Sequence, residues 1–234
     1  MMDFTGIKGV LFDLDGTLYR QTPMRALMAA ELAMLPLSGP RKAPRRLKAL
    51  QAYRAAQERL RDATAAGSSA SQVEAAARAS GLSVAEVETL VAEWMIRRPL
   101  KYLQFCRRPG VPALLDRLSR AGIRAGILSD YPAAEKLRAL GLEGRFAPVL
   151  CATDREIGAF KPSPRGFLRA CDVWNLAPSE VLYVGDRIEV DAAGAAAAGM
   201  RCAIIGAARD RSGSAERFEM YPSFERLSRA FDHR

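Results

Sequence analysis

The sequence contains almost no histidine: its one histidine, His233, is the residue next to the C-terminal one. Ser-His-Asp and Cys-His catalysis, phosphohistidine chemistry and histidine-ligated zinc sites all depend on an imidazole. The sequence therefore argues strongly against these mechanisms. If the protein is an enzyme, carboxylates or lysines must supply its acid–base chemistry.

Cysteines and long apolar runs are also scarce. The four cysteines lack metal-type spacing, and a disulfide framework is not typical of a chain of 234 residues, so we expect free thiols in the core: Cys106, Cys151, Cys171 and Cys202. No apolar run is long enough to form a transmembrane segment. The N-terminal run is interrupted by aspartates and does not resemble a signal peptide, so we expect a cytoplasmic protein. With 49% hydrophobic residues, the chain can bury a sizeable core.

Positive charge is concentrated in one part of the chain. The net charge is +9, and residues 19–104 hold 14 Lys and Arg against 7 Asp and Glu. Eight basic residues stand against the single acidic Glu58 over residues 41–61: Arg41, Lys42, Arg45, Arg46, Lys48, Arg54, Arg59 and Arg61. A solvated helix face is the favoured interpretation, and attraction of an anionic substrate is the alternative. Because Tyr53 is the only aromatic residue in this stretch, nucleic acid is not a favoured partner.

The order of predicted elements indicates an α/β fold with a helical insert. Residues 22–104 have helical spacing throughout, with helices expected from Thr22 and over 45–65, 71–79 and 83–96. Strands at 123–128, 149–152, 181–184 and 202–205 alternate with helices and follow the apolar run that ends at Phe12. This alternation predicts a doubly wound, Rossmann-like parallel sheet with helices on both faces. The predicted domains are 1–18 and 105–234 for the α/β core, and 19–104 for the helical domain.

The first apolar run ends in two aspartates. Val10-Leu11-Phe12 leads directly into Asp13-Leu14-Asp15-Gly16-Thr17. Side chains two residues apart in an extended segment share a face, so Asp13 and Asp15 are expected close together where a buried strand ends. Two carboxylates cannot both stay unpaired in a site of low dielectric constant, so either one holds a proton or a cation lies between them. A solvated Asp-Gly turn is the alternative interpretation.

Other strand ends carry residues suited to phosphate and metal chemistry. Ser129 and Asp130 follow the second strand, and Asp186 and Asp191 follow the fourth, with Lys161 before a proline between them. In a parallel sheet these groups converge at one edge. Asp13, Asp186 and Asp191 then offer an oxygen-only site for Mg²⁺. Ser129 and Lys161 are donors for phosphate oxygens. Taken singly, Ser129 also fits a helix cap, and Gly185-Asp186 a turn.

These residues together resemble the haloacid dehalogenase (HAD) superfamily, whose four motifs match Asp13-Leu14-Asp15-Gly16-Thr17, Ser129, Lys161 and the segment from Gly185 to Asp191. The resemblance covers about residues 6–18 and 105–206 and implies a helical C1-type cap after the first motif. It implies that Asp13 is the nucleophile and a Mg²⁺ ligand. Asp15 is then the acid–base residue, whose backbone carbonyl also binds Mg²⁺. By the same resemblance, Thr17 and Ser129 bind phosphate, and Lys161 steadies the nucleophile and the phosphoryl group. Asp186 binds Mg²⁺. Asp191 supports Lys161 or a metal-bound water, and Glu189 is less well spaced for that role.

The function this resemblance implies is a Mg²⁺-dependent phosphatase that hydrolyses a small phosphorylated metabolite through an aspartyl-phosphate. The dehalogenase branch lacks the second aspartate of the first motif, whereas Asp15 is present here. A phosphonatase needs a cap lysine in a recognisable context, which is missing. The remaining alternatives are a sugar phosphomutase with the same core residues and a catalytically idle binding protein that uses the basic helical domain. The sequence does not predict the substrate's identity or the oligomeric state.

Overall fold

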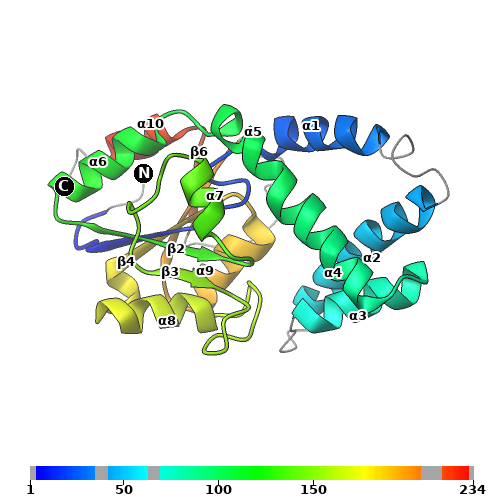
Figure 1. Ribbon diagram of the computed structural model, residues 1–234. Coiled ribbons are helices and arrows are strands. Elements are labelled where there is room, and N and C mark those ends of the chain that lie inside the picture. Colours follow the sequence, from blue (N-terminus) through cyan, green and yellow to red (C-terminus); the bar gives the residue numbers. More distant parts are fainter. Residues whose placement is uncertain (1–3, 35–41, 63–68, 207–217, 232–234) are drawn as a thin grey trace. The chain divides into compact units, whose positions relative to one another are not determined.

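The computed structural model describes residues 4–34, 42–62, 69–206 and 218–231 (Figure 1). The chain divides into two compact units, a core unit of Met1–Arg20 with Arg107–Arg234 and a helical unit of Gln21–Cys106. His233 and Arg41 lie outside the described residues. Within the described part, no helix combines the length and the apolar composition needed to cross a membrane. All four cysteines are free and buried, as predicted.

The core unit is built on a six-stranded, fully parallel sheet, which confirms the predicted α/β class. The strands are β1 (Gly9–Phe12), β2 (Arg124–Ser129), β3 (Val149–Cys151), β4 (Val181–Gly185), β5 (Arg201–Ile205) and β6 (Phe218–Tyr221). Their order is β3-β2-β1-β4-β5-β6. The chain leaves β1 towards β2 and leaves β4 towards β5, so the topological switch point lies between β1 and β4, where such sheets place their sites.

Strand β6 is not among the five strands that the sequence pattern predicts. Its four residues, Phe218–Tyr221, include Glu219 and are half-buried except at the last position. A short strand at the edge of a sheet pairs on one side only and does not need a continuous apolar run. The hydrophobic pattern of such a segment is therefore too weak to predict a strand.

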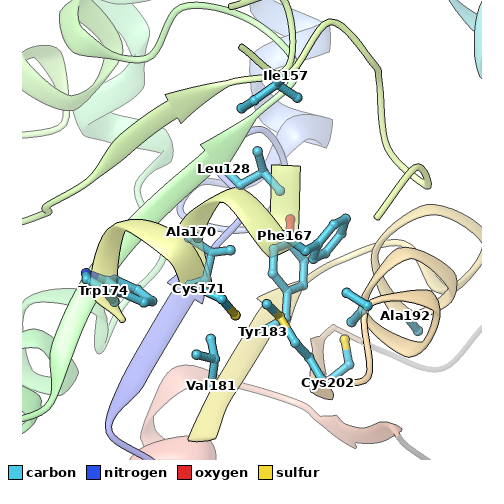
Figure 2. Packing of buried hydrophobic residues seen from close by; sticks show 14 of the residues in the cluster. Leu128, Ile157, Phe167, Ala170, Cys171, Trp174, Val181, Tyr183, Ala192 and Cys202 are labelled. Carbon is cyan, nitrogen blue, oxygen red and sulfur yellow. The ribbon is translucent and has the colours of Figure 1, made fainter. Parts of the chain in front are cut away.

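Helices cover both faces of the sheet: α6 (Val111–Arg120) and α10 (Phe224–Ala230) lie on one face, α8 (Arg165–Trp174) and α9 (Ala193–Ala197) on the other (Figure 1). Alternate residues of β1 supply the two sides. Phe12 contacts Phe224 of α10 at a ring-centroid distance of 6.4 Å, whereas Leu11 belongs to the cluster under α8. Figure 2 shows this cluster, in which Phe167 of α8 lies against Tyr183 of β4, and Trp174 at the other end of α8 lies against β1 and β2. The apolar layers hold the strand ends in fixed register.

The helical unit consists of α1 (Gln21–Ala33), α2 (Ala43–Asp62), α3 (Ser69–Ser80), α4 (Val84–Val91), a π-helical segment (Ala92–Arg97) and α5 (Arg98–Cys106). Helix α4 begins with a capping box in which Ser83 and Glu86 each accept from the other's backbone N–H. The helix expected to end at Ile96 instead continues through the π-helical segment into α5. Pro99 is the second residue of α5, which directly follows the π-helical segment.

Candidate functional site

The polar residues predicted to converge do follow neighbouring strands at the carboxyl edge of the sheet. Asp13 follows β1, and its backbone N–H donates to the Val184 carbonyl of β4 at 2.8 Å. Phe12 is paired with Val184, so Asp13 and Gly185 lie at the same level of the two central strands. Ser129 is the last residue of β2. The edge at the switch point therefore carries the ends of β1, β2 and β4.

Lys161 lies at the centre of this group. The residue is 4% exposed, and its ammonium donates to three acceptors: Asp13 Oδ1 at 2.6 Å, Asp191 Oδ1 at 2.8 Å and the Tyr183 hydroxyl at 3.0 Å. An ammonium has three donors, so all of its hydrogen-bonding capacity is used. Burial opposes the charge, but Asp13 and Asp191 raise the pKa of Lys161 well above its usual value. Lys161 is therefore a fixed positive charge beside Asp13.

Asp191 anchors the loop after β4. Its Oδ1 contacts Lys161 and accepts from the Tyr183 hydroxyl at 3.2 Å, and its Oδ2 accepts the backbone N–H groups of Asp186 and Arg187, each at 3.0 Å. Burial raises the pKa of Asp191, but Lys161 and these backbone donors bring it below its usual value. Gly185 makes this close approach possible, because a Cβ there would lie 2.4 Å from Asp191 Cγ. Asp191 is thus a structural carboxylate with both oxygens occupied.

Asp13, Asp186 and Asp191 form a carboxylate group that fits a hard cation. One oxygen of each lies within 4.8 Å of the other two. Among the described residues, no group donates a hydrogen bond to the Asp186 carboxylate. Burial, followed by repulsion from Asp191, raises the pKa of Asp186 to about 6, and burial together with the neighbouring carboxylates raises the pKa of Asp13. Three carboxylates against the single ammonium of Lys161 leave net negative charge, and oxygen ligands of this kind are those that Mg²⁺ prefers.

Two hydroxyls predicted to bind phosphate belong to the segments that end β1 and β2. The Thr17 hydroxyl donates to Asp13 Oδ2 at 2.9 Å, and Thr17 is fully buried. Ser129 is also fully buried, and its hydroxyl oxygen accepts the backbone N–H of Tyr131 at 3.3 Å. The Ser129 hydroxyl proton therefore stays available for another acceptor. With Lys161 on Oδ1 and Thr17 on Oδ2, the Asp13 carboxylate has a fixed orientation.

Asp15 has surroundings of its own. Its carboxylate accepts from Lys136 Nζ at 2.7 Å on Oδ1 and 2.6 Å on Oδ2, and from the Tyr19 hydroxyl at 2.5 Å on Oδ1. Burial raises the pKa of Asp15, but Lys136 and Tyr19 bring it below its usual value. For two buried aspartates this close in sequence, a shared proton or an intervening cation is the expectation. In the structure Asp13 and Asp15 each have a separate lysine.

Sequence reasoning missed three residues of this site. Lys136 is on α7 (Ala134–Ala139), seven residues after Ser129, where no motif marks it. Arg108 donates to the Gly16 carbonyl at 3.0 and 3.1 Å and so holds the loop after Asp15. Tyr183 carries the one polar atom among the side chains of β4, and this single hydroxyl in an otherwise apolar strand is the only signal that could have drawn attention to it.

Comparisons with known proteins find one family of hydrolases. Residues 7–199 match the family model of haloacid dehalogenase-like hydrolases. The N-acetylmuramic acid 6-phosphate phosphatase of Pseudomonas aeruginosa is 30% identical over 192 residues, which are 77% of this chain and 74% of that one. The phosphoglycolate phosphatase of Xanthomonas campestris is 36% identical over 197 residues, which are 82% and 80% of the two chains. Among solved structures, a 2-haloacid dehalogenase from Pseudomonas syringae is similar with a TM-score of 0.68 and 26% identity, covering 97% of this chain and 99% of that one.

Proposed function

The chain belongs to the haloacid dehalogenase-like hydrolase family, and we propose that it is a Mg²⁺-dependent phosphatase of a small phosphorylated metabolite. One observation carries the proposal: a second aspartate, Asp15, follows Asp13 by two residues and has an ionic partner of its own. The similar curated proteins hydrolyse phosphate esters. The family's dehalogenase branch lacks an aspartate at this position, so the similarity to a dehalogenase structure reflects the shared fold.

In the proposed reaction Asp13 attacks phosphorus. A new bond forms between an Asp13 oxygen and phosphorus, the ester P–O bond breaks, and the leaving oxygen takes a proton from Asp15. Asp15 then removes a proton from water, whose oxygen attacks the aspartyl-phosphate and releases phosphate and free Asp13. Lys161 and Thr17 orient Asp13 in the free site. When the substrate binds, they exchange hydrogen bonds of the free site for bonds to the phosphoryl oxygens, and the Ser129 hydroxyl adds a further donor. In this scheme, Asp191 holds Lys161 in place.

Members of this family generally use Mg²⁺, and Asp13, Asp186 and the Asp15 backbone carbonyl are the groups that would hold it. When bound, it would screen the repulsion between the anionic nucleophile and the anionic phosphate. The helical unit, which is inserted between β1 and β2, is proposed as the cap that selects the substrate. The candidate substrates of the proposed phosphatase are small phosphorylated carboxylic acids, sugars and amino acids, since the similar phosphatases are named for phosphoglycolate, N-acetylmuramic acid 6-phosphate and phosphoserine.

The proposal is tested with a panel of phosphate monoesters, assayed for phosphate release with Mg²⁺ and with EDTA. We expect Mg²⁺-dependent release by the wild type and none by Asp13→Asn. Asp116→Asn makes the same change at an exposed surface position of the core unit and is expected to be fully active. Conversion of a sugar phosphate to its isomer without phosphate release would identify a phosphomutase. Release of halide from a 2-haloacid would identify a dehalogenase. Turnover by Asp13→Asn would refute the assigned nucleophile.

A further inference from the structure

Lys136 is a buried lysine outside the four family motifs. Its side chain is 9% exposed, and the only carboxylate its ammonium contacts among the described residues is that of Asp15, where it reaches both oxygens at 2.6 and 2.7 Å. Burying an ammonium is costly unless it is paired, so the pairing with Asp15 is part of the stable fold. Lys136 comes from α7 and Asp15 from the loop after β1, so the contact joins two separate segments of the core unit.

The contact gives the Asp15 carboxylate one orientation. Lys136 donates to both oxygens, and the hydroxyl of Tyr19, four residues further along the chain, donates a third hydrogen bond to Oδ1. The carboxylate group of Asp13, Asp186 and Asp191, which fits a cation, does not include the Asp15 side chain. The Asp15 carboxylate thus lies outside this group, and its contacts with Lys136 give it a defined direction as a proton acceptor.

We propose that Lys136 is a positioning residue that orients Asp15 for the hydrolysis of the aspartyl-phosphate, an inference that rests on the proposed phosphatase function. In that step Asp15 takes a proton from the attacking water, and a base must lie within hydrogen-bonding reach of that water. A misplacement of about 1 Å in such a group costs about 10²-fold in rate. Lys136 does not contact the substrate in this proposal. It acts through Asp15 alone.

The substrate p-nitrophenyl phosphate separates the two chemical steps. Its leaving group departs without needing a proton, so the formation of the aspartyl-phosphate depends little on Asp15, whereas its hydrolysis still requires a base. For Lys136→Met we expect kcat to fall by about 10²-fold. We expect kcat/KM to stay within about threefold of the wild type, because kcat/KM reports the first step. A burst of p-nitrophenol close to one equivalent of enzyme should precede the slow steady state.

Three controls make the result decisive. Lys136→Arg keeps the charge and is expected to recover part of kcat. Arg138→Met alters an exposed cation of the same helix, which pairs with Glu143, and is expected to leave kcat unchanged. In the Asp15→Asn background, Lys136→Met is expected to have no further effect on kcat, since the residue through which it acts has been neutralised.

The proposal is overturned if Lys136→Met lowers kcat/KM as much as kcat, as a phosphate-binding or purely structural lysine would. It is also overturned if the burst is absent, or if the loss persists in full in the Asp15→Asn background. Failure of the proposed function is a separate result: the wild type would then release no phosphate from any ester, before a variant is tested.

Discussion

Replacing Lys161 by methionine should destabilise the core unit far more than the loss of one surface ion pair. The Lys161 ammonium contacts Asp13 at 2.6 Å and Asp191 at 2.8 Å, and all three side chains are at most 7% exposed. Removing one partner of a buried ion pair leaves uncompensated charge and costs about 3–5 kcal/mol. Since domains are stable by only about 5–15 kcal/mol, this loss is a large fraction of the total.

A matched lysine provides the control. Lys8 contacts Glu180 at 2.6 Å, the same distance as Lys161 to Asp13, but the two side chains are 63% and 29% exposed. Exposed pairs contribute about 0–1 kcal/mol, so Lys8→Met should cost no more than that. Tyr183→Phe removes only the hydroxyl that bonds Lys161 and Asp191 and should cost about 1 kcal/mol.

The assay is urea unfolding of the metal-free protein at 25 °C. The decrease in the free energy of unfolding caused by Lys161→Met should be larger at pH 7.5 than at pH 5. In the variant, the stranded Asp13 and Asp191 have pKa values raised above those of the unfolded chain. The folded state then holds more protons than the unfolded one, and its stability falls as pH rises through those pKa values. If Lys161→Met and Lys8→Met lose the same free energy of unfolding, the argument from burial is wrong.

Three further predictions concern the cation and the basic helix. Mg²⁺ should raise the midpoint of thermal unfolding more at pH 7.5 than at pH 5, because the Asp186 carboxyl, whose pKa is about 6, is protonated at the lower pH. Asp186→Ala should abolish that stabilisation and weaken Mg²⁺ activation; full activity of this variant in EDTA would contradict the metal assignment. Changing Arg45, Arg46 and Lys48 of α2 to Glu should leave kcat/KM and its salt dependence unchanged, as expected for a solvated face. A lower kcat/KM that depends less on salt concentration would instead indicate electrostatic steering of the substrate.

The sequence predicts the candidate site well where the signal is local. An apolar strand that ends in a carboxylate or a hydroxyl is visible over a few residues, and a parallel sheet brings such ends together without any information on side-chain contacts. That is why Asp13, Ser129 and Asp186 could be placed at one edge of the sheet. The same reasoning predicts the helical insert, because amphipathic spacing is a local property too.

The contacts between these residues could not be predicted, because each joins distant segments through single atoms. Lys136 reaches Asp15 across 121 positions of sequence, and Lys161 reaches Asp13 across 148. Helix α7, which carries Lys136, is only six residues long, and nothing in its composition distinguishes a buried lysine from an exposed one. Tyr183 in a buried strand fits a core residue equally well until its hydroxyl is seen against Lys161 and Asp191.

The two lysines give two neighbouring aspartates opposite electrostatic surroundings. Lys136 holds the pKa of Asp15 below its usual value, which favours the step in which Asp15 accepts a proton from water and opposes the step in which it donates one to the leaving oxygen. The pKa of Asp13 is raised by burial and by Asp191 and Asp186, in spite of Lys161, and this opposes the ionised form that a nucleophile requires. A divalent cation among these carboxylates would reverse the balance, because an opposite charge nearby favours the ionised form. In the proposed enzyme, the competence of Asp13 thus depends on the cation, whereas that of Asp15 depends on Lys136. Two residues of one type, two positions apart, would in this way carry different roles in the same reaction.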